Sequence, residues 1–475
     1  MIFNRHITRS GYMMLAVAML TVIAGLFSEE VYSQIARLAA RDPGVRTGSY
    51  GAGGMLQELT YQEKKVFEKG KEQFEEVQSV LGGTIDGEET ELGLGPRFNL
   101  DSCGGCHAQP DIGGTSPFVN PQVEVAKKEG ANNDLPPFIK MDGPVREARF
   151  KHNQDGTADG GVHALFTIAG RRDAWGCWLH QPDFRTAVAR QNVVFRIPTP
   201  LFGAGLIEAI DDDTILANLQ ANSAAKQSLG IRGRPNRTSG RPNTSGNDGT
   251  VTRFGWKAQN KSLEIFSGEA YNVEQGITNE LFPQERDEAP ACRFNATPEN
   301  RTNIDARDPL EVPGDVVKFA MFMRFLAPPA PSLDTPGGIG SIERGRNLFA
   351  DVGCAMCHTP TLHTGKRIAV NALQDKDVNL YSDLTLHNMG SELADDIIQG
   401  DAGGDEFRTA PLWGLGKRIF FLHDGRTKDL LEAIQAHAGS GGGRYVPSEA
   451  NQVIAQFHRL NEIDKQHVLH FLRSL

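Results

Sequence analysis

Two short motifs carry the clearest chemistry in this 475-residue chain. The sequence CGGCH begins at Cys103 and the sequence CAMCH begins at Cys354, so in both a histidine directly follows the second cysteine. In this arrangement two thiols can add to the vinyl groups of one haem, and the adjacent histidine can bind its iron. The motifs therefore predict two covalently bound haem c groups, held by Cys103, Cys106, Cys354 and Cys357, with His107 and His358 as iron ligands.

Other classes of site also contain two cysteines separated by two residues. A structural zinc site uses such pairs, but it takes four ligands from neighbouring cysteine and histidine pairs. A thioredoxin-like dithiol uses the same spacing within a βαβ unit. Neither alternative explains why histidine follows the second cysteine in both motifs, so the spacing favours haem.

The second axial ligand of each iron decides what the haem can do. A second protein ligand makes an electron carrier, whereas an open position lets a small molecule react. Spacing alone does not select this ligand among the residues that follow the second motif, which are Met389 and the histidines His363, His387, His423, His437, His458, His467 and His470.

Two further cysteines, Cys177 and Cys292, remain outside the haem motifs. In an oxidising compartment such a pair can form a disulfide. The alternative is two free, buried thiols, because the sequence does not show how far apart they lie.

The N-terminus is typical of an export signal. A basic stretch, MIFNRHITRS, precedes an apolar run from Gly11 to Phe27, and cleavage is expected near Ser33. The run has about 17 residues, the lower limit for crossing a bilayer, so a retained membrane anchor is the alternative. We expect a bacterial protein that is periplasmic or otherwise extracytoplasmic, and that meets a membrane only through this N-terminal segment.

The composition indicates a globular protein with an acidic balance. The chain is 39% hydrophobic and 23% charged, and its net charge of -10 argues against nucleic-acid binding, which needs a basic surface. An acidic surface can dock a basic partner instead. The expected partners are an electron-donor protein, such as a small cytochrome or a cupredoxin, and a small-molecule substrate.

Similar helical patterns precede the two motifs. Apolar residues and one glycine recur at helical spacing in both segments: Phe67, Gly70 and Phe74 in the first, and Ile342, Gly345 and Phe349 in the second. The C-terminal NEIDKQHVLHFLRSL predicts an amphipathic helix. This plan is similar to the cytochrome c fold, in which the first and last helices cross beside the haem and a glycine permits close approach.

The sequence thus predicts a mainly α fold with two cytochrome c-like haem domains. About 200 residues separate the two haem segments, too many for a connection, so the first domain should contain a large irregular insertion. The expected divisions are residues 1–33 as signal peptide or N-terminal anchor, 34–326 as the first haem domain with its insertion, 327–340 as a linker rich in proline and glycine, and 341–475 as the second haem domain.

Longer stretches of the chain resemble a known family, the bacterial di-haem oxidoreductases. These proteins are also labelled thiol oxidoreductases and are related to the di-haem cytochrome c peroxidases. The matching stretches are GLGPRFNLDSCGGCHAQPDIGG around the first motif, RIPTPLFGAGLIEAI from Arg196, TRFGWKAQNKSL from Thr252, YSDLTLHNMG from Tyr381, FRTAPLWGLG from Phe407 and FLHDGRTKDLLEAIQAHAG from Phe421.

The resemblance implies ligands that spacing does not supply. It places the distal ligand of the second haem at His437, where many such peroxidases have methionine; histidine there implies a bis-His iron of lower potential. A surface histidine is the alternative. For the first haem, His163 is the candidate distal ligand and His180 the runner-up, each with a structural role as the alternative. Arg171 and Arg172 can pair with haem propionates or remain solvated.

Two further sets of residues have alternative interpretations. Trp256 and Trp413 can bridge two haems for electron transfer or simply pack in the core. His423 and Asp424 can handle protons near the second haem or serve only the turn in which they stand. Relatives among the peroxidases hold calcium between their domains, but no motif here names calcium ligands.

The function expected from these features is that of an exported di-haem c-type cytochrome acting as an oxidoreductase. Electrons would pass between the two haems to a small substrate, with peroxide as the leading candidate. The main alternative is a pure electron-transfer protein in which both irons are six-coordinate. A second alternative is oxidation of a protein or thiol substrate through the haem pair. The catalytic residues are not identified at this level.

Overall fold

The computed structural model describes residues 39–49, 51–85, 87–238, 250–284, 289–333 and 337–475. The predicted export segment, residues 1–33, lies outside these ranges. Within them no helix has both the length and the apolar character needed to cross a bilayer.

The fold mixes helices with small sheets and is less helical than predicted, with 31% helix and 14% strand. The helices are α2 Tyr61–Glu75, α3 Cys103–Cys106, α4 Gln122–Val125, α5 Phe184–Ala189, α6 Ala204–Glu208, α7 Asp212–Gln220, α8 Ser223–Leu229, α9 Leu263–Gln275, α10 Asp315–Phe325, α11 Gly338–Asp351, α12 Leu430–Gln435, α13 Asn451–Arg459 and α14 Glu462–Ser474.

The strands are short and form two three-stranded sheets and four pairs in the described ranges. One sheet has the order β1-β3-β2, from β1 Gln78–Ser79, β2 Leu81–Ile85 and β3 Glu88–Leu92; the other has the order β6-β5-β8, from β5 Glu147–Phe150, β6 Val162–His163 and β8 Val193–Arg196. The pairs join β4 Arg97–Phe98 to β7 Phe166–Thr167, β9 Asn236–Arg237 to β10 Val251–Thr252, β11 Leu362–His363 to β12 Asp377–Val378, and β13 Leu386–Asn388 to β14 Glu406–Arg408.

Helices α2 and α10 support the first haem motif. Helix α2 begins at Thr60, whose side chain caps the first turn, and it buries Phe74 against Phe322 with ring centroids 4.9 Å apart. A Cβ atom at Gly70 would overlap the backbone oxygen of Lys318 in α10. The two helices therefore approach closely at the glycine that the spacing singled out.

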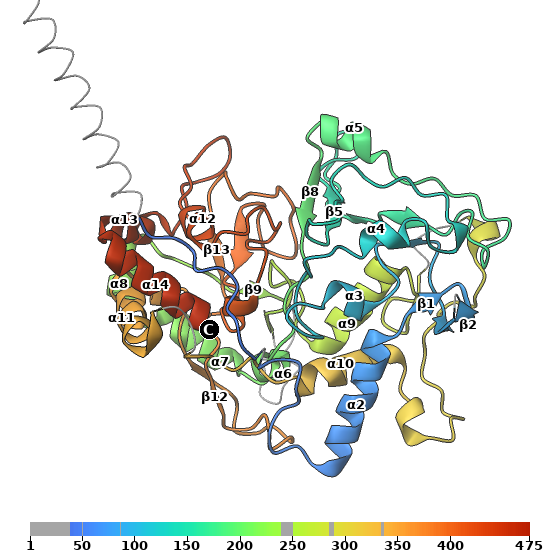
Figure 1. Cartoon of the computed structure of the whole chain (residues 1–475), viewed down its shortest axis with the longest axis horizontal. Coiled ribbons are helices and arrows are strands. Elements are labelled where there is room, and N and C mark those ends of the chain that lie inside the picture. Colours follow the sequence, from blue (N-terminus) through green and yellow to red (C-terminus); the bar gives the residue numbers. More distant parts are fainter. Residues whose placement is uncertain (1–38, 50, 86, 239–249, 285–288, 334–336) are drawn as a thin grey trace, which may run out of the picture.

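Helices α11 and α14 repeat this arrangement beside the second motif. Phe349 of α11 packs against Phe471 of α14, with ring centroids 5.4 Å apart. A Cβ atom at Gly345 would overlap the backbone oxygen of His467. Each CxxCH motif thus follows a helix that crosses a later helix at a glycine, although the two pairs occupy opposite ends of the molecule (Figure 1).

The two halves share parts of one core. A single cluster of buried apolar residues includes Phe319 and Phe322 from the first half and Leu384 and Trp413 from the second. The last helix also contacts the first described residues of the chain, because Arg473 of α14 forms a buried ion pair with Asp42. The core therefore includes residues from both sides of the predicted linker, residues 327–340.

The long insertion contacts both halves. Arg234 forms a β-bridge with Leu386, and the ammonium group of Lys257 lies 3.1 Å from the carboxylate of Asp395. In Figure 1, α6 and β9 of the insertion lie between the two helical ends. The insertion therefore packs against the segment that follows the second motif.

The structure also contains the disulfide considered from the sequence. Cys177 and Cys292 are bonded, with Cα atoms 4.7 Å apart, and both are buried in a core cluster beneath the β6-β5-β8 sheet region. The bridge closes a loop of 115 residues within the insertion. It therefore restricts the unfolded chain strongly.

Candidate di-haem site

The first motif opens onto a large cavity. Ser102 caps the short helix α3 by accepting a hydrogen bond from Gly105, which sets the two cysteines on one wall. Together with the part open to solvent, the cavity encloses about 1050 Å³, and its apolar lining includes Phe74, Leu100, Leu201, Phe266, Phe319 and Met323. Its apolar walls fit a flat hydrophobic cofactor.

His107 lies in this cavity with its tautomer fixed. Its Nδ1 donates a hydrogen bond to the backbone oxygen of Gly114 at 2.9 Å, since a carbonyl can only accept. Burial lowers the pKa of His107 to about 4, so the ring is neutral near pH 7. A neutral imidazole whose Nδ1–H is held in this way offers Nε2 to a metal.

The second motif opens onto a separate cavity of about 1420 Å³. Cys354, Cys357 and His358 line it, and the Nδ1 of His358 donates to the backbone oxygen of Tyr381 at 3.0 Å. Burial and the neighbouring His437 lower the pKa of His358 to about 4. The four motif cysteines form no disulfide, so each cavity keeps two thiols available for covalent attachment.

His437 faces His358 across the second cavity. It follows α12 directly, and its Nδ1 donates to the backbone oxygen of Ala433 at 2.8 Å. The ring centroids of His358 and His437 are 6.5 Å apart. With metal–nitrogen bonds of about 2 Å on each side, as in other metal–histidine sites, this separation leaves room for one ion between the two rings.

The first cavity has a different lining. Among the described residues that line it, His107 is the only histidine, and two buried carboxylates lie there instead. Glu147 comes from β5 and Glu274 from α9, and Asn99 donates a hydrogen bond to Glu274 at 2.7 Å. The two carboxyl groups are hydrogen-bonded to each other.

The two carboxyl groups differ in charge near neutral pH. Burial, together with the charge of Glu147, raises the pKa of Glu274 to about 8. Burial also disfavours the charged form of Glu147, but Arg149 and Arg196 outweigh it and lower the pKa of Glu147. The first cavity therefore contains a proton donor beside a proton acceptor.

The structure does not bring His163 or His180 to the first cavity. The ring of His163 stacks on Phe150 at 3.9 Å, and its Nε2 bonds to Asp159 at 2.8 Å. His180 lies in a loop, and its backbone oxygen accepts a hydrogen bond from the guanidinium group of Arg97. Neither histidine lines the cavity, so neither takes the distal position expected from the sequence.

Two other expected pairs have structural partners. Arg171 binds Asp173 at 2.8 Å and Arg172 binds Glu129 at 2.8 Å, and neither arginine lines a haem cavity. Asp424 holds Arg426, at 2.8 Å. His423 does line the second cavity, where its ring stacks on Phe407 at 4.3 Å.

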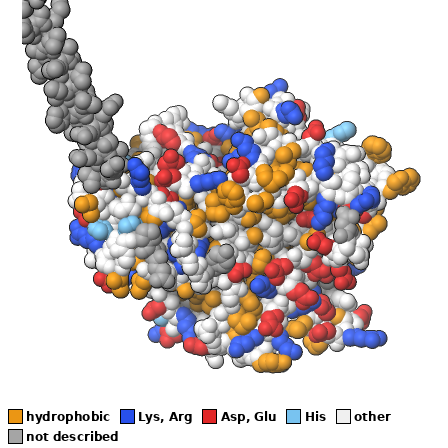
Figure 2. Space-filling view, in the orientation of Figure 1, with side chains coloured by type: hydrophobic (Ala, Val, Ile, Leu, Met, Phe, Trp, Pro, Cys, Tyr) orange, Lys and Arg blue, Asp and Glu red, His pale blue; other side chains and the backbone are white. Residues whose placement is uncertain are grey.

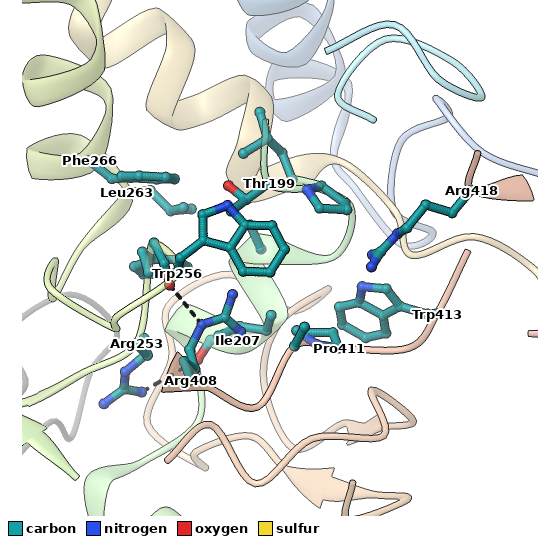
Figure 3. A pocket seen from close by; sticks show the side chains of 16 residues that line it. Thr199, Ile207, Arg253, Trp256, Leu263, Phe266, Arg408, Pro411, Trp413 and Arg418 are labelled. Atoms are coloured by element: carbon teal, nitrogen blue, oxygen red, sulfur yellow. Dashed lines mark hydrogen bonds between the residues drawn. The ribbon is translucent and has the colours of Figure 1, made fainter. Parts of the chain in front are cut away.

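A third, smaller cavity lies between the two large ones. Its volume is about 530 Å³, and Trp256 lines all three cavities. The indole nitrogen of Trp256 donates to the backbone oxygen of Ile197 at 2.9 Å, which fixes the ring. Figure 3 shows this indole near the centre of the cavity, with Trp413 on the side of Arg418. Of the two tryptophans considered from the sequence, Trp256 is therefore the one shared by both large cavities.

His387, one of the histidines considered as a ligand from the sequence, has acidic partners instead. His387 stands in the wall of the second cavity between two acids, with Nδ1 2.8 Å from Glu449 and Nε2 2.9 Å from Asp383. No group of three or more histidine, cysteine, aspartate or glutamate side chains in the described ranges could hold a separate metal ion. The described side chains around these cavities therefore do not form a metal site of their own.

Comparison with known proteins agrees with the resemblance seen in the sequence. Residues 149–475 match the family described as "Di-haem oxidoreductase, putative peroxidase", so the match includes the second motif and His437 but begins after the first motif. No curated protein matches the chain.

Several solved structures are similar to parts of the chain. A MauG-like protein associated with microbial copper homeostasis is 17% identical, with 58% of this chain and 90% of that one covered and a TM-score of 0.29. Hydrazine synthase of Kuenenia stuttgartiensis is 14% identical, with 58% and 88% covered and a TM-score of 0.27. The di-haem peroxidase BthA of Burkholderia thailandensis is 13% identical, with 47% and 65% covered and a TM-score of 0.28. The family match covers well over half of the length of this chain. The chain therefore belongs to the di-haem oxidoreductase family.

Proposed function

We propose that this protein is an exported c-type di-haem oxidoreductase whose first haem reacts with a small oxidant and whose second haem stores and passes on electrons. Family membership implies two haems. The observation that carries the proposal is the difference between the linings of the two cavities: His437 lies near His358 in the second, whereas the first contains a carboxyl pair and no described histidine besides His107.

The residues present fit two covalent haems. Cys103 and Cys106 would form thioethers to the first, and Cys354 and Cys357 to the second, from the walls of two mainly apolar cavities. His107 and His358 would be the proximal ligands. When bound, the haems supply the redox chemistry, and the chain sets which iron is accessible.

His437 would close the second iron. Its ring is held by Ala433 and stands opposite His358, so a small molecule would have to displace a buried and hydrogen-bonded ligand. Bis-His ligation also favours a lower potential than His–Met ligation. This site is suited to electron storage and transfer.

Glu147 and Glu274 would manage protons at the first iron. Reduction of hydrogen peroxide to two water molecules consumes two protons and two electrons. Glu274 is protonated near pH 7 and can donate, while Glu147 is ionised and can accept the proton of an incoming peroxide. Peroxide is therefore the substrate that best suits this wall.

Trp256 provides the route between the haems in this proposal. It lines both haem cavities and the smaller cavity between them, and a hydrogen bond to Ile197 holds its ring in place. A fixed aromatic ring at this position shortens the gap that an electron must cross.

A pure electron-transfer protein is the competing function, and it requires a second protein ligand on the first iron. Met323 lines the first cavity, but it belongs to α10. Phe319 of the same helix packs against Phe74, which in turn packs against His107. Met323 is therefore the thioether that this competing function would need as the second ligand.

The location and partners remain proposals that rest on the sequence and on the disulfide. The bond between Cys177 and Cys292 suits an oxidising, extracytoplasmic compartment. Acidic and basic side chains are interspersed on the face in Figure 2, while the whole chain carries a net charge of -10. A small basic cytochrome or cupredoxin is the proposed electron donor.

Reaction of the fully reduced holoprotein with hydrogen peroxide, followed by stopped-flow absorbance, tests this function. Glu147→Gln should slow oxidation of the haems by about 10²- to 10⁴-fold, the usual contribution of acid–base catalysis. Glu264→Gln on α9, which lies outside the cavity lining, is the control and should react like the wild type. Equal rates in all three proteins would contradict the proposal.

A further inference from the structure

Two arginines beside the second cavity have no acidic partner among the described residues. Arg408 of β14 donates from Nε to the backbone oxygen of Gly255 at 3.0 Å and from Nη1 to that of Thr409 at 3.3 Å. Arg418 is only 8% exposed, and within the described ranges its guanidinium group has no hydrogen-bond partner. Arg418 is therefore a buried cation and Arg408 a partly buried one, and neither forms an ion pair in the described chain, although the charge of Asp383 acts on Arg408 from a distance.

Three other buried arginines of the described chain form ion pairs. Arg253 is paired with Asp212, Arg473 with Asp42, and Arg196 with Asp395. Burial lowers the pKa of Arg408 and Arg418 to about 10, and the charge of Arg418 adds to the effect at Arg408. Since an unpaired buried charge is strongly unfavourable, these two positions need an anion from outside the chain.

The two guanidinium groups point to where this anion would lie. Arg408 and Arg418 both line the second haem cavity and the small cavity beside it. Figure 3 shows both groups directed into the space near Trp256, Pro411 and Trp413, whose rings offer no negative charge. A planar guanidinium fork matches a carboxylate best, because it can donate two parallel hydrogen bonds.

We propose that Arg408 and Arg418 bind the propionate carboxylates of the second haem at the edge that faces Trp256. The proposal rests on the two-haem function described above. In this role the arginines are positioning residues. They would neutralise the propionates, orient the porphyrin edge toward Trp256, and stabilise the reduced iron by keeping positive charge nearby.

The reduction potential of the second haem tests this role independently of peroxide turnover. Arg418→Gln and Arg408→Gln should each lower the potential of the low-spin haem, because a nearby positive charge favours the reduced iron. We expect at least a tenfold change in the reduction equilibrium constant, about 59 mV for one electron. Arg418→Lys keeps the charge and should restore most of the difference.

Lys417→Gln is the matched control, because it removes one positive charge at the neighbouring position. The ammonium group of Lys417 binds the backbone oxygens of Arg46 and Gly48 and does not line either cavity. Its substitution should leave the potential near that of the wild type. Resonance Raman bands of the propionate groups should shift in the two arginine-to-glutamine variants and not in this control.

Two outcomes would overturn the proposal. One is a potential and a propionate spectrum that stay unchanged in both glutamine variants although both haems are attached. The other is a wild-type potential that changes with added phosphate, which would assign the site to a free anion. A slow peroxide reaction with a normal propionate spectrum would instead count against the proposed function alone.

Discussion

The imidazole rings of His358 and His437 face each other across the second cavity with their centroids 6.5 Å apart. Each ring donates its Nδ1–H to a backbone carbonyl, of Tyr381 and Ala433 respectively, so both Nε2 atoms are in the form that binds a metal. Among the described residues lining the first cavity, no second histidine accompanies His107. Two nearly identical motifs thus face different side chains, which come from residues far from them in the sequence.

Replacing His437 should open the second haem. We expect His437→Ala to convert the second iron from low spin to high spin, and His437→Met to keep it low spin at a higher potential, because Met ligation raises the potential. Electron paramagnetic resonance and a redox titration measure these changes. His458→Ala, an exposed histidine of α13, is the control. An unchanged low-spin signal in His437→Ala would show that another residue closes this iron.

The peroxide reaction should depend on the protonation of Glu274. Its pKa is raised to about 8 by burial and by Glu147, so the proton it can donate is lost as pH rises through about 8. The rate of haem oxidation should therefore fall above pH 8 in the wild type. In Glu274→Gln the rate should be lower and this fall should disappear. A wild-type rate that is flat from pH 6 to pH 10 would exclude Glu274 as the donor.

The crossing of α11 and α14 should not tolerate a side chain at Gly345. A Cβ atom there overlaps the backbone oxygen of His467, so Gly345→Ala should lower the free energy of unfolding by about 1–3 kcal/mol. Gly340→Ala in the same helix meets no atom within 4 Å and should stabilise by about 0.5–1 kcal/mol. Denaturant unfolding of both variants compares the same substitution at two positions, and equal effects would contradict the close crossing.

Glu76 should make the stability depend on pH in the acid to neutral range. Burial and the charges of Glu91 and Asp315 raise the pKa of Glu76 from 4.5 to about 7 in the folded protein. Its contribution to stability is therefore complete below pH 4.5 and is lost as pH rises through about 7. Glu76→Gln should have a higher melting temperature than the wild type at pH 8 and the same one at pH 4.

Thermal unfolding at the two pH values checks this prediction. Glu75→Gln provides the control, because Glu75 is the exposed neighbour at the end of α2. A difference between Glu76→Gln and the wild type that is as large at pH 4 as at pH 8 would point to packing instead of ionisation.

Local sequence patterns predicted well the helices that pack beside the CxxCH motifs. The spacing of Phe67, Gly70 and Phe74 indicated the helix that crosses α10, because such a pattern depends only on neighbours along the chain. The CxxCH motifs are local for the same reason. The helical content was overestimated, because the long insertion contains two- to four-residue strands that leave little periodic signal.

The far walls of the cavities depend on contacts that are distant in the sequence. Glu147 and Glu274 meet only because β5 and α9 pack against the same cavity, and neither residue stands in a motif. One signal was present: charged residues alternate with apolar ones in REARF, from Arg146 to Phe150, which is typical of a strand with one polar face. That this face is buried beside a haem cavity cannot be predicted from alternation alone.

His163 illustrates the limit of selecting a ligand by residue type. It stands on the short strand β6, so its direction is set by pairing with β5, and this pairing places its ring on Phe150. Arg408 and Arg418 were not predicted from the sequence. What distinguishes them is that neither forms an ion pair with a described acid, and this can be seen only in the packed structure.

The central claim is that one iron is closed by two histidines and the other is open. Electron paramagnetic resonance of the oxidised, two-haem protein at pH 7 tests it most directly. The account predicts one low-spin ferric signal, from the iron between His358 and His437, and one high-spin signal from the iron bound by His107, with the low-spin signal lost in His437→Ala. Two low-spin signals in the wild-type protein, in the oxidised and in the half-reduced state, would contradict it and favour a dedicated electron carrier.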